Sequence, residues 1–300
     1  MSTIDLSQYD VPGRGHGILD VFRWRYLLRV LVRKGTATRY RNSVFGWGWS
    51  YVKPAIQYLV YFLIMGILLG FGGRTVNYPV YLFAGIIALN LFNEAFGNAT
   101  TAITDNRALV RKIYLPRELF PIAAIIVAFI HFLPQVAILL IVLLLFGWTP
   151  SFAGIGAVLL GIVLITVLSL GLGLFFAGIN VRYRDAQNFV EIIRMVSTWA
   201  SPVLYIWPLV AEKAPSIVRH IYFSNPVTVA VELFHWGWWQ PTLEVAARRH
   251  PDLAQQVADT DALPPHFGYY VAFAIIACVI VLAIGQAVFR HFERTFAQDL

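Results

Sequence analysis

Long apolar runs that carry almost no charge dominate the chain. Between Leu119 and Val181 there is no Asp, Glu, Lys or Arg, and a Gly-Trp-Thr-Pro-Ser turn signal at 147–151 divides this run. A helix needs about 20 apolar residues to cross the hydrocarbon core of a bilayer. The pattern therefore predicts an all-α integral membrane protein with six transmembrane helices, at about 54–72, 79–101, 119–146, 152–181, 195–211 and 267–289.

Lysine and arginine residues lie mostly on one side of these predicted spans. Eighteen of the 23 fall in residues 1–53, 105–118 or 182–194, or after Phe289. Because positive residues are retained in the cytoplasm, both termini are predicted to be cytoplasmic, with the chain passing many times through the plasma (inner) membrane. The net charge of +7 is thus a topology signal and a surface for lipid head groups, and it does not indicate nucleic-acid binding.

The first 53 residues are expected to form a cytoplasmic region, followed by a transmembrane domain over 54–300. Within this region, Ile18–Lys34 is amphipathic: Arg25, Arg29 and Arg33 recur every four residues, and the leucines lie on other faces. A helix of this kind lies in the plane of the membrane interface, with its apolar side in the lipid. Residues 1–17 lack the apolar core of a signal peptide, so no cleavage is expected.

A short apolar stretch, Val227–Trp239, precedes the last predicted span. Its 13 residues include only two ionisable side chains, Glu232 and His235, and it is too short to cross the membrane. It is therefore predicted to be a re-entrant or interfacial segment on the outer side, followed by a polar external connection over 241–266. Two interpretations of its tryptophans stay open, an aromatic belt at the lipid interface and a stacking surface for sugar rings; these residues are Trp236, Trp238 and Trp239.

The second predicted span carries a polar stripe at helical spacing. A carboxylate at mid-membrane costs about 2.5–3.5 kcal/mol on insertion scales, so it should face a water-filled path or a polar helix contact. Both interpretations remain open, with Asn90, Glu94 and Asn98 as channel candidates. In the third span, His131 precedes Pro134 and is expected to satisfy backbone that the proline frees. The whole stripe comprises Asn90, Asn93, Glu94, Asn98 and Thr101.

The sequence lacks the residues that ATP hydrolysis, metal binding and catalysis require. None of the four lysines follows a glycine, as the phosphate-binding loop of an ATPase requires, so the chain is not expected to hydrolyse ATP by that route. The seven histidines form no His-x-x-x-His pair, and Cys278 is the only cysteine. No catalytic residue, metal site or bound cofactor is therefore predicted. Only 13% of residues are charged, against about 25% in soluble domains.

Four segments resemble the ABC-2-type permeases of polysaccharide exporters, which serve O-antigens, teichoic acids and galactans. The first is RYRNSVFGWGW at 39–49, followed by Lys53-Pro54, and the second is LVRKIYLPRE at 109–118. The third is NVRYRD at 180–185, with SPVLY at 201–205 after it, and the fourth is Asn225-Pro226. The order and placement of these segments cover nearly the whole chain.

The resemblance implies a permease that forms a homodimer and works with two copies of a separate ATPase, which would bind ATP and Mg. The substrate would be a lipid-linked glycan, moved outward on a polyprenyl pyrophosphate. Short gate helices are expected over 216–239, and the connection at 241–266 is longer than is usual for the family. The loop expected to contact the ATPase comprises Asn106, Arg107, Leu109, Arg111, Lys112, Ile113, Tyr114, Pro116, Arg117 and Glu118.

Two further groups of residues receive roles from the same resemblance. A second cytoplasmic loop would support the ATPase contact through Arg182, Tyr183, Arg184 and Asp185, and the pyrophosphate would be recruited by Arg33, Arg39 and Arg41. The main alternative is an ABC-2 permease for a drug or free lipid. A membrane glycosyltransferase would need clustered cytoplasmic acids, whereas the cytoplasmic loops here are short and basic. A non-transporting membrane scaffold is the third alternative.

Overall fold

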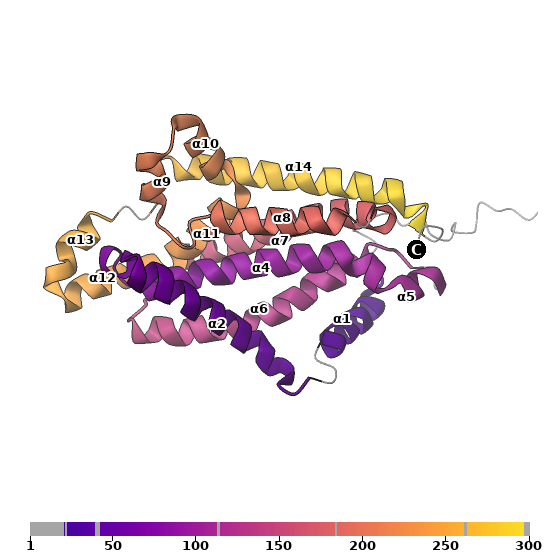
Figure 1. Cartoon of the computed structure of the whole chain (residues 1–300), viewed down its shortest axis with the longest axis horizontal. Helices are drawn as coiled ribbons and strands as arrows, with labels where there is room; N and C mark the ends of the chain where they lie inside the picture. The colour runs from indigo at the N-terminus through magenta and orange to yellow at the C-terminus, as the bar shows by residue number, and fades with distance from the viewer. Residues whose placement is uncertain are drawn as a thin grey trace, which may run out of the picture.

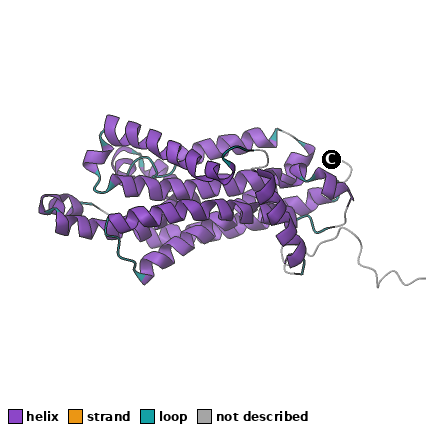
Figure 2. Ribbon diagram, turned by 90° about the horizontal axis from the view of Figure 1, so that it is seen from below, coloured by secondary structure: helices purple, strands orange, loops and turns teal. Residues whose placement is uncertain are grey.

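The computed structural model describes residues 21, 23–39, 43–112, 115–183, 185–260 and 263–296, without the side chain of Arg39. Within these ranges all regular secondary structure is helical and no strand occurs (Figure 2). Five segments of the described chain are long and apolar enough to cross a membrane: Gly46–Leu68, α4 (Tyr78–Asp105), α6 (Leu119–Leu145), α7 (Phe152–Arg182) and α14 (Phe267–Glu293).

Helices α4, α6, α7 and α14 match the predicted spans to within a few residues and run side by side along the molecule (Figure 1). The first span is composite. It joins a 3₁₀ turn (Gly46–Gly48), α2 (Trp49–Tyr61) and a π-helical segment (Phe62–Leu68). Its predicted start at Pro54 is wrong, because the helix begins five residues earlier and Pro54 lies inside it. Little of this span is buried, and in Figure 1 it crosses the front of the bundle obliquely.

The predicted continuous span at 195–211 is wrong. Helix α8 (Ala186–Trp199) begins nine residues earlier and ends in a non-helical turn, and α9 (Trp207–Lys213) follows. The chain still passes from the end of the bundle near the C-terminus to the opposite end over α8, this turn and α9 (Figure 1). The charge of Arg194 suggested a boundary in the sequence. In the structure Arg194 lies within α8, and its guanidinium points toward α4 and a cavity.

Side-chain hydroxyls satisfy the carbonyls that this break exposes. The Tyr81 hydroxyl lies 2.7 Å from the Pro202 carbonyl oxygen and 2.9 Å from that of Tyr205, so its single hydrogen is shared between the two acceptors. Tyr78 donates to Leu204 O at 2.9 Å, and Thr228 donates to Ala200 O at the same distance. Irregular backbone inside a membrane protein is tolerated only where the protein itself supplies such partners. The broken segment is therefore a built part of the fold.

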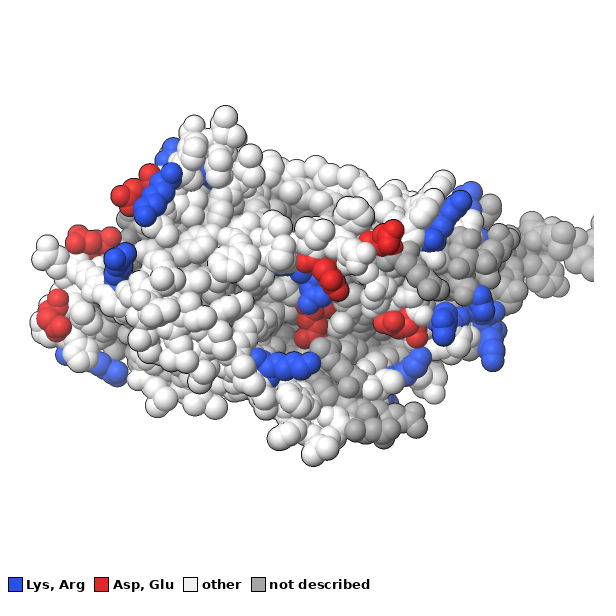
Figure 3. All heavy atoms as spheres, viewed as in Figure 1, with Lys and Arg blue, Asp and Glu red and all other residues white. Residues whose placement is uncertain are grey.

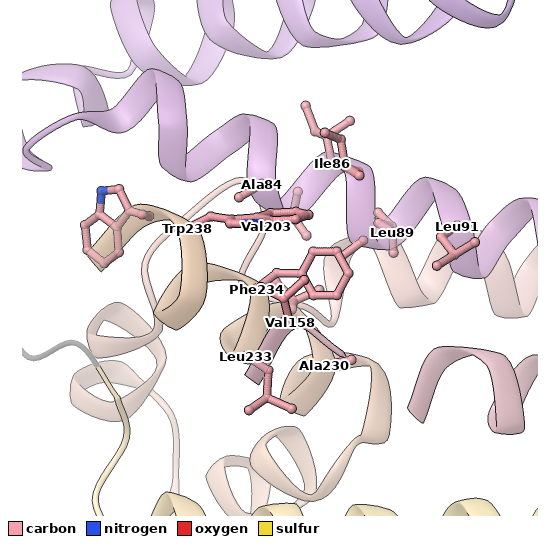
Figure 4. Close-up of a cluster of buried hydrophobic side chains, with 14 of the residues drawn as sticks. Ala84, Ile86, Leu89, Leu91, Val158, Val203, Ala230, Leu233, Phe234 and Trp238 are labelled. Atoms are coloured by element: carbon pink, nitrogen blue, oxygen red, sulfur yellow. The ribbon is translucent and has the colours of Figure 1, made fainter. Parts of the chain in front are cut away.

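Short helices occupy the space between the broken segment and the last span. These are α10 (Ser216–Ser224), α11 (Pro226–Phe234) and a π-helical segment at His235–Trp239, which confirms short helices over 216–239. Figure 4 shows Phe234 of α11 pointing toward α4, with Leu89 and the α7 residue Val158 near its ring, whereas Leu233 points away from α4. The ring of Phe234 sits where α7 has Gly161, since a Cβ there would lie 2.9 Å from it.

Glycines bring α7 against its neighbours at backbone distance. A Cβ on Gly285 of α14 would lie 2.0 Å from the carbonyl oxygen of Gly171, and one on Gly173 would lie 2.4 Å from the Ala99 Cβ of α4. Small residues allow such close contact between membrane helices, where van der Waals packing stabilises association. Helices α4, α7 and α14 therefore form a tightly packed frame.

The remaining short helices lie at the two ends of the bundle. At the end near the C-terminus are α1 (Arg25–Arg39) and α5 (Arg107–Lys112), and α3 (Phe71–Arg74) follows the first span (Figure 1). The predicted connection at 241–266 contains α12 (Gln240–Arg249), a 3₁₀ turn (Pro251–Leu253) and α13 (Ala254–Ala258), which lie at the opposite end.

Helix α1 is amphipathic as expected, but it runs to Arg39, and residues 18–20 and 22 lie outside the described part of the chain. Its Leu31 is buried, and Leu27 and Leu28 are partly buried beside it. Gly35 comes so close to α6 that a Cβ would lie 3.0 Å from Val127. The apolar side of α1 therefore packs on α6 within this chain.

Candidate functional site

The polar stripe of α4 forms one wall of a cavity of about 540 Å³ between α2, α4, α6 and α8. All five stripe residues line it: Asn90, Asn93, Glu94, Asn98 and Thr101. We call this cavity the mid-bundle pocket. Figure 3 shows a small group of charged atoms midway along this face, with a broad uncharged surface on the side away from the C-terminus. The stripe therefore faces open space in the middle of an apolar bundle.

Hydrogen bonds between α4 and α6 hold part of this wall. Glu94 Oε1 lies 2.5 Å from His131 Nδ1, and Asn90 Nδ2 donates to Gln135 Oε1 at 3.2 Å. Gln135 Nε2 in turn donates to the His131 carbonyl oxygen. The expectation that His131 satisfies backbone near Pro134 gives way to this contact with Glu94, because the imidazole points across to α4. The stripe therefore bonds across to α6 and also lines a cavity, while its role in a water-filled path stays a prediction.

A second cavity, of about 440 Å³, continues the polar wall toward α1. It lies between α1, α4 and α6 and shares Asn98 and Thr101 with the mid-bundle pocket. Lys34 of α1 lines it and donates to Asn106 Oδ1 at 2.8 Å. Asp105, at the end of α4, also lines it. Polar side chains thus line two adjoining cavities along α4, from α1 to the middle of the bundle.

The predicted ATPase-contacting loop lies at the end of the bundle near the C-terminus (Figure 1). In α5 the side chains of Arg107, Arg111 and Lys112 are exposed, Leu109 is half-buried, and Val110 anchors the helix as a buried residue. Pro116 is half-buried. Ile113 and Tyr114 lie outside the described residues. The exposed charges of α5 are therefore available to a partner.

The end of this loop is tied to α14. Arg117 Nη1 donates to the Glu293 carbonyl oxygen, and Gln286 Nε2 donates to Glu118 Oε1 at 3.0 Å. The Arg117 guanidinium also lies over the Phe296 ring, 5.5 Å from its centroid. Burial lowers the pKa of Arg117, and the carboxylates of Glu293 and Glu118 oppose this change. The end of the loop is thus in direct contact with the end of the last span.

The second predicted loop and the predicted recruitment residues are only partly described. Tyr183 and Asp185 are exposed, the Arg182 guanidinium lies over the Tyr183 ring at 5.6 Å, and Arg184 lies outside the described residues. Arg33 is exposed on α1. The side chain of Arg39 and the whole of Arg41 lie outside the description, so the structure does not place these three arginines together.

Two of the predicted gate tryptophans are packed inside the protein. Trp238 and Trp239 are 5% and 3% exposed, and Trp239 Nε1 donates to the Val76 carbonyl oxygen at 2.9 Å. Trp236 is half-buried. In this conformation Trp238 and Trp239 present no open face to a sugar or to lipid.

Sequence reasoning missed the contribution of α8 to the mid-bundle pocket. Gln187, Glu191 and Arg194 all line it, together with Lys53 and Gln57 of α2. The signal was present, since positions i, i+4 and i+7 share one face of a helix. The charge of Arg194 conceals it, because a charged residue at the edge of an apolar run predicts the boundary of a span. Among the residues that the structure describes, no group of three His, Cys, Asp or Glu could hold a metal ion.

Comparison with known proteins gives consistent matches. Residues 26–238 match the family model described as "ABC-2 type transporter". The chain is 25% identical over 274 residues to an O-antigen export system permease protein RfbA of Klebsiella pneumoniae, which covers 91% of this chain and 95% of the relative. It is 28% identical over 190 residues to the protein of that name from Myxococcus xanthus (63% and 71%). It is 24% identical over 200 residues to the polysialic acid transport protein KpsM of Escherichia coli (65% and 74%).

Proposed function

The chain belongs to the ABC-2 type transporter family, and we propose that it exports a polysaccharide linked to polyprenyl pyrophosphate from the cytoplasmic side outward. It is a multi-pass membrane protein whose relatives are permeases, so it is not itself an enzyme. The observation that carries the proposal is the mid-bundle pocket. A polar cavity midway along apolar helices is costly in lipid and marks a pathway for a polar cargo.

The pocket also supports a homodimer. It opens on the face that α2 and α8 border, where Ile56, Leu63, Phe189 and Met195 are more than two-fifths exposed. Lipid tails cannot satisfy the polar side chains of the pocket, because they offer no hydrogen-bond partner. In the proposal, a second copy packs on these apolar edges, and the two pockets face each other across one water-filled path.

A separate ATPase would drive the transport. In the proposal two copies bind ATP and Mg and contact this chain through α5 and the loop at 182–185. The exposed Arg107, Arg111 and Lys112 suit an acidic groove on that partner. The link of Arg117 and Glu118 to α14 would carry the movement into the bundle.

Charge placement supports cytoplasmic termini in the plasma membrane. In Figure 3 lysine and arginine atoms cluster at the end of the molecule near the C-terminus, with acidic atoms beside them, and both signs also occur at the opposite end. The substrate pyrophosphate would be recruited at that end by Arg33, Arg39 and Arg41. The short helices over 216–239, with Trp236, Trp238 and Trp239, would form the outer gate and would have to move for a glycan to pass.

The test is depletion of this protein in its host, followed by extraction of lipid-linked glycans and a test of their sidedness in spheroplasts. We expect a glycan carrier to accumulate that is accessible only from the cytoplasmic face. A glycan pool that is exported normally would remove the polysaccharide assignment and favour an ABC-2 permease for a drug or free lipid.

A further inference from the structure

We propose that the mid-bundle pocket binds a phosphate oxyanion and that Arg194 is the residue that holds it. The proposal rests on the function proposed above where it takes this oxyanion to be the pyrophosphate of the transported lipid. It adds a binding site inside the bundle, separate from the recruitment residues at the cytoplasmic end.

Arg194 is a cation without a described counter-ion. Among the residues that the structure describes, no carboxylate lies within ion-pair distance of its guanidinium. Its Nε is buried and has no hydrogen-bond partner. An arginine midway along membrane helices is costly in lipid, and such residues usually pair with another group or serve transport. The position of Arg194 therefore requires an acceptor that the described chain does not supply.

The wall of α4 leaves room for the guanidinium. Gly97 faces it, and a Cβ at that position would lie 3.1 Å from Arg194 Nη1 and 3.4 Å from Cζ. The planar group therefore rests against helix backbone. A guanidinium held in this way offers its N–H groups as a fork, the geometry that binds two oxygens of one phosphate.

Neutral donors and one further cation surround this position. Asn98 and Gln187 line the pocket, and no hydrogen bond to either side chain occurs within the described structure. The exposed Lys53 lines the same pocket from α2. An oxyanion beside Arg194 could thus accept hydrogen bonds from three helices.

Neither of the two carboxylates that line the pocket is a counter-ion of Arg194. Glu94 is held by His131 at 2.5 Å, on the wall formed by α4 and α6. Glu191 is exposed and makes no ion pair with Arg194, although both side chains belong to α8. A cavity of about 540 Å³ also leaves space for a group larger than a single ion.

The test measures binding of farnesyl pyrophosphate by calorimetry to the full chain in nanodiscs of phosphatidylcholine, with farnesol as the uncharged reference. We expect saturable binding by the natural protein and a loss of affinity of about tenfold or more in Arg194→Gln, because a charged hydrogen-bond donor is removed. Gly97→Ala should also weaken binding, since its Cβ displaces the guanidinium, and Arg194→Lys should retain more affinity than Arg194→Gln. Arg248→Gln is the matched control, because Arg248 is exposed on α12.

Equal affinity of Arg194→Gln and Arg248→Gln would overturn the proposal. If Arg194→Gln does not fold, Arg194→Met replaces it, and an affinity of Arg194→Met equal to that of Arg248→Gln overturns the proposal. Nanodiscs that also contain phosphatidylglycerol identify the source of the phosphate: competition assigns the site to a phospholipid head group, and its absence assigns it to the pyrophosphate. Depletion that leaves glycan export unchanged would refute the proposed function alone, because this binding assay does not depend on export.

Discussion

Replacing Tyr81 by phenylalanine should destabilise the protein by removing a single oxygen atom. The Tyr81 hydroxyl serves the carbonyl oxygens of Pro202 and Tyr205 in the turn after α8. The ring is buried and lies 3.9 Å from the His235 ring, centroid to centroid. Phenylalanine keeps this stacking, so the substitution tests the hydrogen bonds without creating a large cavity.

The size of the effect follows from the number of carbonyls. Hydrogen bonds between membrane helices contribute about 0.6 kcal/mol on average and up to about 1.7, whereas a buried acceptor left without a donor costs about 1–3. A carbonyl inside a helix accepts a hydrogen bond from a backbone N–H. The carbonyls of Pro202 and Tyr205 lie in a turn instead, and the substitution removes the only side-chain donor described for them. We therefore expect a loss of about 1–2 kcal/mol, which raises the unfolding constant by roughly 5- to 30-fold.

The measurement is equilibrium unfolding in mixed micelles with increasing SDS, followed by circular dichroism. Tyr269→Phe is the control, because Tyr269 lies on α14 and is 80% exposed. The variant Tyr78→Phe should add to the loss, since it frees the carbonyl of Leu204. Equal stability of Tyr81→Phe and Tyr269→Phe would refute the idea that side-chain hydroxyls hold the broken segment.

Three other predictions concern the path, the loop and the frame. Glu94→Leu should abolish glycan export while Glu94→Gln retains part of it, because the amide still bonds across to α6; normal export by both would remove the path assignment. Arg111→Glu should leave folding intact and abolish export and stimulation of ATPase activity in the reconstituted complex, and retained export would remove the loop assignment. Gly285→Val should lower stability by several kcal/mol through overpacking against Gly171, measured by the same SDS titration. Gly268→Ala, where a Cβ meets open space, is its control, and equal stability of the two would contradict the close contact of α7 and α14.

Apolar runs without charge predicted the long helices well. The run from Leu119 to Val181 has a turn signal at its middle, and the structure divides it there, with α6 ending at Leu145 and α7 beginning at Phe152. Hydropathy predicts such segments well because, in lipid, a single chain segment can satisfy all its backbone hydrogen bonds only as a helix. The polar stripe was also predictable, since helical spacing alone places Asn90, Glu94 and Asn98 on one face.

Contacts between distant segments were not predictable in this way. The turn after α8 depends on Tyr78 and Tyr81, which lie more than 120 residues earlier in the chain. No local pattern connects them to Pro202. Arg194 misled the placement of a span for a related reason: its cost in a membrane is offset by a cavity whose other walls come from α2 and α4. Such sites depend on tertiary structure, which one sequence does not display.

The first span is less buried than the other helices that could cross the membrane. Glycine contacts clamp α4, α7 and α14 together at backbone distance, while little of the 23-residue span Gly46–Leu68 is buried. At 1.5 Å per residue this span is about 35 Å long, so a tilt of about 10° swings its far end by about 6 Å. In the proposed function, the tilt of this one span would set the width of the mid-bundle pocket, and α4, α7 and α14 would not need to separate.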